Sequence, residues 1–159
     1  MAIIIEHFRH ASRDKPGIHL NQKGVETARK QGKKFGPYGL VVSSPLTRAV
    51  ETAVAMGYAV DRTEKFISDI PDAVHQTVSY DAGFEAIGAH LDSERSVIQD
   101  YLREMRQFYE ELMRDFPKKG RILLVSHGGV IEWSALAVHP EAKTWGKPMK
   151  KGEGFRLVF

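Results

Sequence analysis

The chain has 159 residues, enough for one hydrophobic core of ordinary size and too few for two comfortable domains, so we expect a single domain over residues 1–159. Hydrophobic residues make up 42% and charged residues 27% of the sequence, a composition that excludes a disordered or membrane-spanning chain. There is no cysteine, which excludes disulfides, thiolate nucleophiles and cysteine-ligated metals. No signal-peptide pattern precedes the first apolar run, so we expect a cytoplasmic protein with no membrane partner.

The net charge of +3 is unevenly distributed along the chain. Lys and Arg outnumber Asp and Glu by 9 to 4 in residues 1–60 and by 8 to 3 in residues 117–159, whereas residues 61–116 hold 6 against 13. Both ends are therefore basic and the middle is acidic. The basic residues cluster only in pairs, such as Lys33-Lys34 and Lys150-Lys151, and no nucleic-acid partner is predicted.

The first predicted element is a buried strand that begins with Ile3-Ile4-Ile5, because β-branched apolar runs favour strands. Within four residues this run leads into Arg9-His10. Ligands of open α/β sheets gather at the carboxyl ends of strands, so this pair is well placed to bind an anion. Polar residues at a strand end can also simply face solvent, and other stretches must decide between the two interpretations.

A helix is predicted over about residues 22–35, with Asn21 as its N-cap and Gly36-Pro37 as its stop. A short buried strand follows at Leu40-Val41-Val42 and runs directly into a polar segment, Ser43 to Arg48. Serine followed by proline favours a helix start, so a second helix is predicted from this segment to Gly57.

The second helix carries an apolar stripe at helical spacing, formed by Leu46, Ala49, Val50 and Ala53. Arg48 lies about 200° around the helix from Leu46 and is free to point at a ligand. The alternative is a surface ion pair between Arg48 and Glu51, three residues further along.

The middle of the chain gives weaker signals. Short edge strands are predicted at residues 58–60 and 66–67 and a turn at 69–72, whereas residues 77–90 give mixed signals. From Asp92 onward, apolar residues at helical spacing predict a long amphipathic helix that ends at Pro117-Lys118-Lys119-Gly120.

A third buried strand is predicted at residues 121–125, and it ends in Ser126-His127-Gly128-Gly129 before another helix begins at Val130. Glycines between a strand and a helix let backbone N–H groups approach an anion closely, and the helix dipole favours negative charge there. His127 alone would more often be a structural histidine. Residues 155–159 are predicted to form a closing strand.

Three strand ends thus carry candidate functional residues. Strands separated by helices favour an α/β fold, a three-layer α/β/α sandwich with a mainly parallel central sheet, in which these ends share one edge. Two arginines suit phosphate oxygens, and a histidine beside them keeps a nitrogen lone pair for attack. A metal site is the rival use of two histidines, but neighbouring arginines disfavour a cation, so we predict no metal and no cofactor.

Four motifs in order resemble those of the histidine phosphatase superfamily, which has the phosphoglycerate mutase-like fold. They are Arg9-His10-Ala11, residues 20–24, residues 43–53 and residues 126–129, and only the middle of the chain lacks one. The resemblance implies that His10 is the nucleophile that becomes phosphohistidine, and that Arg9, Arg48, His127 and Gly128 bind the phosphoryl group. The family most often has glycine at the position of Ala11, a small departure that leaves the Arg-His pair intact.

The resemblance also implies a Glu or Asp general acid in the middle of the chain. Ile67-Ser68-Asp69 is most similar to the family's Leu-x-Glu element, so Asp69 is the favoured candidate, with Asp72 and Glu85 as alternatives. Each of the three could equally be a solvated carboxylate in a loop.

The leading hypothesis is a cofactor-independent phosphatase, similar to the small phosphohistidine phosphatases, that acts on a phosphorylated small molecule or a phosphoprotein. One alternative is phosphoglycerate mutase-type phosphoryl transfer, although the tryptophan-containing extension that follows the first motif in mutases is missing. Another is a non-catalytic phosphate-binding or scaffold protein. The sequence does not predict the oligomeric state.

Overall fold

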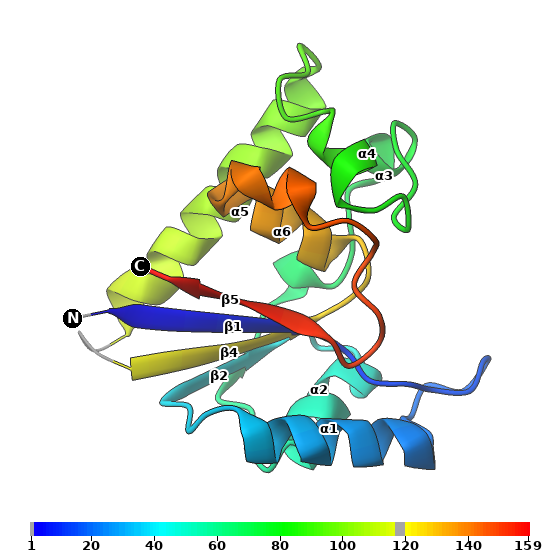
Figure 1. The fold of residues 1–159 in the computed structure, drawn as a ribbon, viewed down its shortest axis with the longest axis vertical. Coiled ribbons are helices and arrows are strands. Elements are labelled where there is room, and N and C mark those ends of the chain that lie inside the picture. Colours follow the sequence, from blue (N-terminus) through cyan, green and yellow to red (C-terminus); the bar gives the residue numbers. More distant parts are fainter. Residues whose placement is uncertain (1, 117–119) are drawn as a thin grey trace. The chain divides into compact units, whose positions relative to one another are not determined.

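The computed structural model describes residues 2–116 and 120–159 and contains one five-stranded sheet (Figure 1). The strands are β1 (Ile3–Arg9), β2 (Leu40–Ser43), β3 (Arg62–Thr63), β4 (Gly120–Ser126) and β5 (Gly154–Val158), in the spatial order β3-β2-β4-β1-β5. The first four strands run parallel, and β5 pairs antiparallel with β1. The α/β class and the mainly parallel sheet are therefore confirmed.

In the described part of the chain, six α-helices and two 3₁₀ helices connect the strands. They are α1 (Gln22–Lys34), α2 (Thr47–Ala55), η1 (Lys65–Ile67), α3 (Asp72–His75), α4 (Phe84–Gly88), α5 (Ser96–Asp115), α6 (Val130–Val138) and η2 (Pro140–Thr144). The predicted stop of the long helix at residues 117–119 lies outside the described residues. Within residues 2–116 and 120–159, none of the helices has the length and apolar character needed to cross a membrane.

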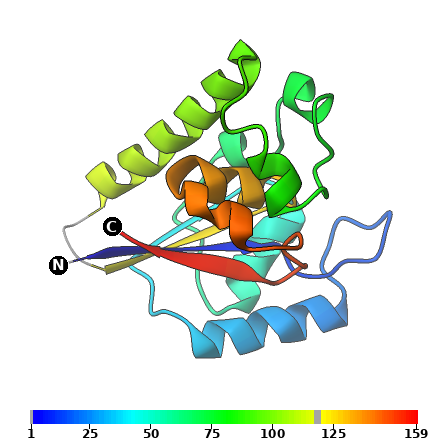
Figure 2. The same cartoon turned by 45° about the horizontal axis from the view of Figure 1, so that its top comes forward.

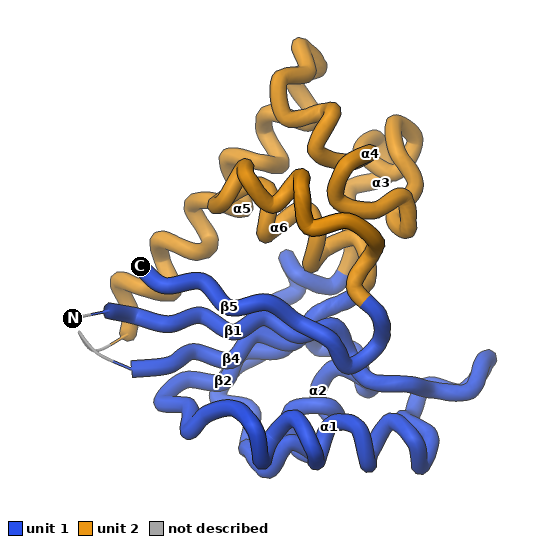
Figure 3. Tube along the Cα trace, in the orientation of Figure 1, with its two compact units in different colours: residues 1–68, 118–127, 150–159 blue, residues 69–117, 128–149 orange. Residues whose placement is uncertain are grey.

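The chain divides into two compact units (Figure 3). Unit 1 comprises Met1–Ser68, Lys118–His127 and Lys150–Phe159, and it holds the whole sheet with α1 and α2. Unit 2 comprises Asp69–Pro117 and Gly128–Met149, and it holds α3, α4, α5, α6 and η2.

In unit 1, α1 and α2 pack side by side on one face of the sheet (Figures 1 and 2). The two helices approach closely because α1 has glycine at position 32, where an added Cβ would lie 1.9 Å from the backbone oxygen of Met56. Small residues on the helices and larger ones on the strands fill the core beneath them. Its buried members are Phe8, Ala11, Ala28, Val41, Ala49, Ala53, Met56, Leu123 and Val125.

The start of α1 agrees with its predicted N-cap, whereas the predicted start of α2 needs a correction. Asn21 Oδ1 accepts the N–H of Gly24 at 2.8 Å, as predicted for α1. In α2, Leu46 is the N-cap residue with extended backbone, and it is 37% exposed, so its assignment to the buried stripe was wrong. The reason is that Ser44 Oγ accepts the Leu46 N–H, so the helix begins only at Thr47 and Leu46 does not share its buried face.

The predicted edge strands at 58–60 and 66–67 are wrong. Asp61 bonds to Val41 through both its backbone N–H (2.9 Å) and its Oδ2 (2.8 Å), and strand pairing begins only afterwards, with Arg62 opposite Val42. The segment around Phe66 forms η1 instead.

In unit 2, the long amphipathic helix is confirmed, although α5 begins at Ser96 rather than at Asp92. It contacts α6 along its apolar face, where the rings of Tyr101 and Trp133 lie 5.8 Å apart (Figures 1 and 2). The buried residues of α5 recur at helical spacing, as the sequence predicts, and are Ile98, Tyr101, Leu102, Met105, Phe108, Tyr109 and Leu112.

Candidate active site

The carboxyl ends of β1, β4 and β2 lie side by side in unit 1. Arg9 is in register with Ser126, and Ser43 with Val125. The backbone ladder extends one residue further, since the His10 N–H donates to Ser126 O at 2.8 Å. His10 and His127 therefore leave neighbouring strands at the same edge of the sheet.

His10 is held with one ring nitrogen free of a proton. Its Nδ1 lies 2.7 Å from the carbonyl oxygen of Ala11, and only a protonated nitrogen can donate to a carbonyl. The lone pair is thus on Nε2, which accepts from Arg48 Nε at 3.3 Å. Burial lowers the pKa of His10 to about 4, the bond to Ala11 opposes this shift, and the charges of Arg48, Arg9 and Lys151 lower the pKa further. The ring is therefore neutral at pH 7.

Arg48 is positioned by a hydroxyl that the sequence did not single out. Thr52 Oγ1 donates to the backbone oxygen of Arg48 at 2.7 Å and accepts the N–H of Ala11 at 2.9 Å. This bridge ties the first turn of α2 to the residue that follows His10. Burial lowers the pKa of Arg48, with a smaller contribution from the charge of Arg13.

The alternative ion pair between Arg48 and Glu51 does not form, because the carboxylate of Glu51 is used elsewhere. Its Oε1 lies 2.5 Å from Nδ1 of His19, and its Oε2 accepts the N–H of Leu20 at 2.8 Å. The guanidinium of Arg48 faces His10 instead.

His127 is 6% exposed, and its ring lies 5.2 Å from that of His10, centroid to centroid. Its Nε2 shares a hydrogen bond of 2.7 Å with the hydroxyl of Ser44. The same hydroxyl accepts the N–H of Leu46 at 3.1 Å, so the start of α2 also fixes the orientation of this imidazole. Sequence analysis missed Ser44 because a serine before proline is explained by helix capping alone.

Arg9 completes the group. It is the last residue of β1, and its N–H donates to Glu153 O at 2.9 Å. Its charge lowers the pKa of His10, so the two side chains are electrostatically coupled. Four of the predicted site residues thus lie together in unit 1, and we call Arg9, His10, Arg48 and His127 the His-Arg cluster.

The remaining predicted residues belong to unit 2. Gly128 directly follows His127 in the chain. The Asp69 side chain is 78% exposed; its Oδ1 accepts the N–H of Ile70 at 2.8 Å and lies 3.1 Å from His75 Nε2. The roles of both residues stay predictions.

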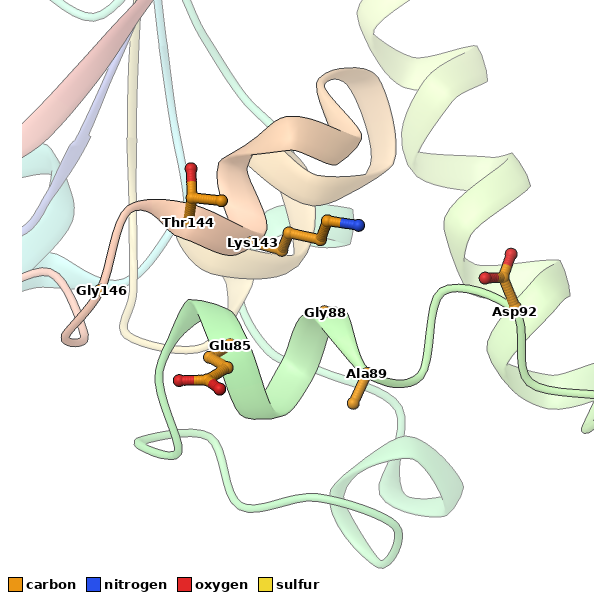
Figure 4. A pocket seen from close by; sticks show the side chains of 7 residues that line it. All are labelled: Glu85, Gly88, Ala89, Asp92, Lys143, Thr144 and Gly146. Carbon is orange, nitrogen blue, oxygen red and sulfur yellow. The ribbon is translucent and has the colours of Figure 1, made fainter.

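The two alternative acids are also exposed. Asp72 is the first residue of α3, where a carboxylate suits the positive end of the helix dipole. Glu85 lies on α4 and lines a pocket of about 590 Å³ together with Lys143 and Thr144 of η2 (Figure 4).

A third histidine of unit 1, His7, has a different environment. It is fully buried in the middle of β1, and its Nε2 lies 2.6 Å from Ser126 Oγ. Burial lowers its pKa to about 3, so it is neutral at pH 7. Because His7 is not at the strand end, we assign it to the core.

The family comparison identifies the class of protein. The sequence profile of the histidine phosphatase superfamily (branch 1) matches residues 8–147. The chain therefore belongs to the histidine phosphatase superfamily, as its four motifs imply. A search of curated protein sequences finds no match. Within the described residues, no group of three or more His, Asp or Glu side chains is arranged to hold a metal ion.

Solved structures share the fold over nearly the whole chain. A phosphoserine phosphatase from Entamoeba histolytica, in complex with 3-phosphoglyceric acid, has a TM-score of 0.69 at 18% identity, covering 97% of this chain and 89% of that one. A phosphoglycerate mutase from Bacillus anthracis has a TM-score of 0.70 at 17% identity, covering 99% and 88%. A mycobacterial glucosyl-3-phosphoglycerate phosphatase has 0.66 at 19% identity, covering 99% and 91%. The phosphoglycerate mutase-like fold is thus confirmed.

Proposed function

We propose that the protein is a phosphatase that hydrolyses phosphomonoesters, or a phosphorylated protein side chain, through a phosphohistidine at His10. The observation that carries this proposal is the state of the His10 ring. Its Nδ1–H is engaged by Ala11 O at 2.7 Å, and its Nε2 lone pair lies 3.3 Å from Arg48 Nε. A neutral nucleophile beside a cation that binds phosphate is what phosphoryl transfer to histidine requires.

In the first step, the Nε2 lone pair of His10 attacks phosphorus, a P–N bond forms and the P–O bond to the leaving group breaks. Arg9, Arg48 and His127 bind the phosphoryl oxygens and stabilise the charge that develops on them. A carboxylic acid, with Asp69 as first candidate and Asp72 and Glu85 as alternatives, gives its proton to the departing oxygen.

In the second step, water attacks the phosphohistidine. The P–N bond breaks, and inorganic phosphate and neutral His10 are released. The carboxylate formed in the first step takes up the proton of the attacking water, so the cycle closes without a cofactor.

Family membership and the names of the structural relatives support a phosphorylated substrate. Two of these relatives are named as phosphatases, of phosphoserine and of glucosyl-3-phosphoglycerate. These likenesses favour a small phosphorylated molecule, while a phosphoprotein remains the other candidate. We also propose that residues 1–159 act as one cytoplasmic domain without a nucleic-acid partner, supported by the paired rather than clustered basic residues.

A turnover screen tests this function. Inorganic phosphate release is measured across sugar phosphates, phosphoamino acids and a phosphohistidine protein, with His10→Ala as the blank. We expect hydrolysis of at least one class by the wild type and none above background by the variant. No turnover on any class would favour the non-catalytic phosphate-binding alternative.

A second candidate function is phosphoglycerate mutase activity, which the likeness to the mutase from Bacillus anthracis supports. The two functions differ in product. A mutase converts 3-phosphoglycerate into 2-phosphoglycerate, whereas a phosphatase releases inorganic phosphate. Phosphorus NMR of one reaction mixture distinguishes them.

A further inference from the structure

Two segments outside the family motifs border the His-Arg cluster within unit 1. One is the loop of residues 12–19 that precedes α1, and the other is the turn of residues 150–153 that precedes β5. Figure 1 shows the turn beside the carboxyl end of β1, whereas the loop starts near that end and extends away from the sheet. Each carries basic side chains that the sequence motifs do not explain.

The turn is anchored directly on the nucleophile's backbone. The N–H of Gly152 donates to the carbonyl oxygens of both Arg9 and His10, each at 3.1 Å. The turn closes on itself through the Glu153 N–H, which donates to Lys150 O at 2.9 Å. Lys151 therefore directly precedes Gly152, the residue whose N–H is bonded to His10. Lys151 is half-buried.

The loop is fixed to the start of α1. Gly24 packs against it so closely that an added Cβ would lie 2.2 Å from Ser12 O, and the Asn21 N–H donates to the same oxygen at 3.0 Å. Arg13 forms a β-bridge with Leu20 and donates from Nη1 to Gly17 O at 2.8 Å. Arg13 is half-buried as a residue, and this hydrogen bond holds its guanidinium against the backbone of the loop.

The charges of these segments act on one another and on the cluster. The pKa of Lys151 is lowered by burial and then by the charges of Arg9, Lys15, Arg13 and Arg48. Five cations are therefore electrostatically coupled within unit 1. Among the described residues, the charged groups that lower the pKa of Lys151 are all cations.

The two carboxylates of these segments have other partners. Asp14 Oδ1 accepts from Asn21 Nδ2 at 3.0 Å, and Glu153 Oε2 accepts from the N–H of Lys150 at 2.9 Å. Cations that lie close together repel one another, and a bound anion stabilises such a group. In the proposed function, one phosphoryl group occupies the four residues of the His-Arg cluster, which leaves Arg13 and Lys151 for another anionic group.

We propose that Arg13 and Lys151 form a second anion site that selects small phosphomonoesters carrying an additional carboxylate or phosphate group. This inference rests on the proposed phosphatase function, since it specifies the substrate of that same site. Arg13 provides a planar fork of donors suited to either group, and Lys151 adds charge without fixed geometry.

Matched substrate pairs test the site. 3-Phosphoglycerate and glycerol 3-phosphate differ only in a carboxylate against a hydroxymethyl group, and fructose 1,6-bisphosphate and fructose 6-phosphate differ in a second phosphate. We expect the wild type to favour the more anionic member of at least one pair by roughly tenfold or more in kcat/KM. The pair that shows the preference identifies carboxylate or phosphate as the recognised group.

Lys151→Gln and Arg13→Gln should each reduce this preference several-fold, mainly through KM. Lys150→Gln is the control, because it removes the same charge from an exposed neighbour in the same turn, and it should keep the preference. Circular dichroism checks that each variant is folded. Equal kcat/KM within both pairs for the wild type, or a preference seen only with acidic phosphopeptides, overturns the proposal.

Calorimetric binding separates this proposal from the proposed function. If the wild type hydrolyses no ester, the phosphatase function fails. Tighter binding of 3-phosphoglycerate than of glycerol 3-phosphate, lost in Lys151→Gln and kept in Lys150→Gln, would still support the anion site. Equal binding of the two compounds would overturn it.

Discussion

The two units of the molecule differ in both architecture and charge. Unit 1 is a sheet with two helices and holds 17 Lys and Arg against 7 Asp and Glu, whereas unit 2 is helical and holds 6 against 13. The basic unit contains the proposed nucleophile and the proposed phosphate-binding side chains of Arg9, Arg48 and His127, and the acidic unit contains Gly128 and all three candidate proton donors.

The carboxylates of unit 1 reinforce this division. Six of its seven hold a hydrogen bond or ion pair within the unit, and the seventh, Glu26, is exposed on α1. The six pairs are Glu6 with Arg156, Asp14 with Asn21, Glu51 with His19, Asp61 with Val41, Glu64 with Arg62, and Glu153 with Lys150. The three candidate acids lie in unit 2, so mutations in each unit should have different effects.

The largest expected effect is in unit 1. His10→Ala should reduce turnover by about 10⁵-fold or more, because the covalent route is lost. Acid-quenched reactions with labelled substrate should trap phosphoprotein in the wild type and none in the variant. His139→Ala, at a partly exposed histidine of unit 2, is the control and should retain activity. Hydrolysis unchanged in His10→Ala would reject His10 as the nucleophile.

The next effect tests unit 2. Asp69→Asn should slow hydrolysis of alkyl phosphates by roughly 10²–10⁴-fold, because their alkoxide leaving groups need a proton. It should slow p-nitrophenyl phosphate much less, since that leaving group departs unprotonated. The rates on alkyl phosphates and on p-nitrophenyl phosphate are compared in the same way for Asp72→Asn and Glu85→Gln, the two alternative acids, which also controls for the loss of a carboxylate. Equal losses on both substrate types would point to another proton donor.

Arg48→Ala should raise KM and lower kcat, with a loss of roughly 10–100-fold in kcat/KM, as expected for a charge-assisted hydrogen bond. The loss should not depend on the leaving group, because Arg48 acts on the transferred phosphoryl group. Arg103→Ala removes the same charge from an exposed ion pair with Asp100 in unit 2 and should change kcat/KM little. Similar losses in the two variants would indicate a long-range charge effect instead.

The smallest effect is on stability. Burial lowers the pKa of His7 to about 3 and of His10 to about 4, so the folded state keeps both rings neutral, while the unfolded chain binds protons below about pH 6.5. The stabilisation is complete above pH 6.5 and declines as the pH falls through that value. Between pH 7.5 and 6, the free energy of unfolding should fall by about 1 kcal/mol for each histidine.

Urea unfolding at the two pH values measures this loss. His7→Gln should unfold with a smaller difference between them, because one of the two titrating groups is gone. A wild-type free energy of unfolding that does not change with pH would show that these rings are not kept neutral by the fold.

Local patterns of the sequence predicted most of unit 1, but they placed the edge strand that follows α2 at the wrong residues. Asn21 caps α1 by accepting a hydrogen bond from the N–H of Gly24, three residues further along the chain. The apolar runs that become β1, β2 and β4 can be recognised in the sequence without knowing which strands pair with them. Parallel strands that alternate with helices must place their carboxyl ends at one edge, so the sequence alone was enough to group Arg9, His10, Arg48 and His127.

Unit 2 was harder to predict because its polar segments are short. Asp72 lies in a helix of four residues and Glu85 in one of five, lengths that show no hydrophobic period. Only α5 is long enough to show its buried face. The sequence therefore supplied three candidate acids and no means of ranking them beyond resemblance to the family.

By itself, the sequence determined four of the five strands, β1, β2, β4 and β5, and the identity of the residues at the carboxyl edge of the sheet, because strand and helix signals come from neighbouring residues. The tertiary structure decided the contacts between distant segments. It directed Glu51 to His19 rather than to Arg48, paired Ser44 with His127, and set the turn that carries Lys151 on the backbone of His10. These contacts join residues that are 32, 83 and 142 positions apart. Local sequence patterns do not predict these contacts, because each contact depends on how elements that are distant in the sequence pack together.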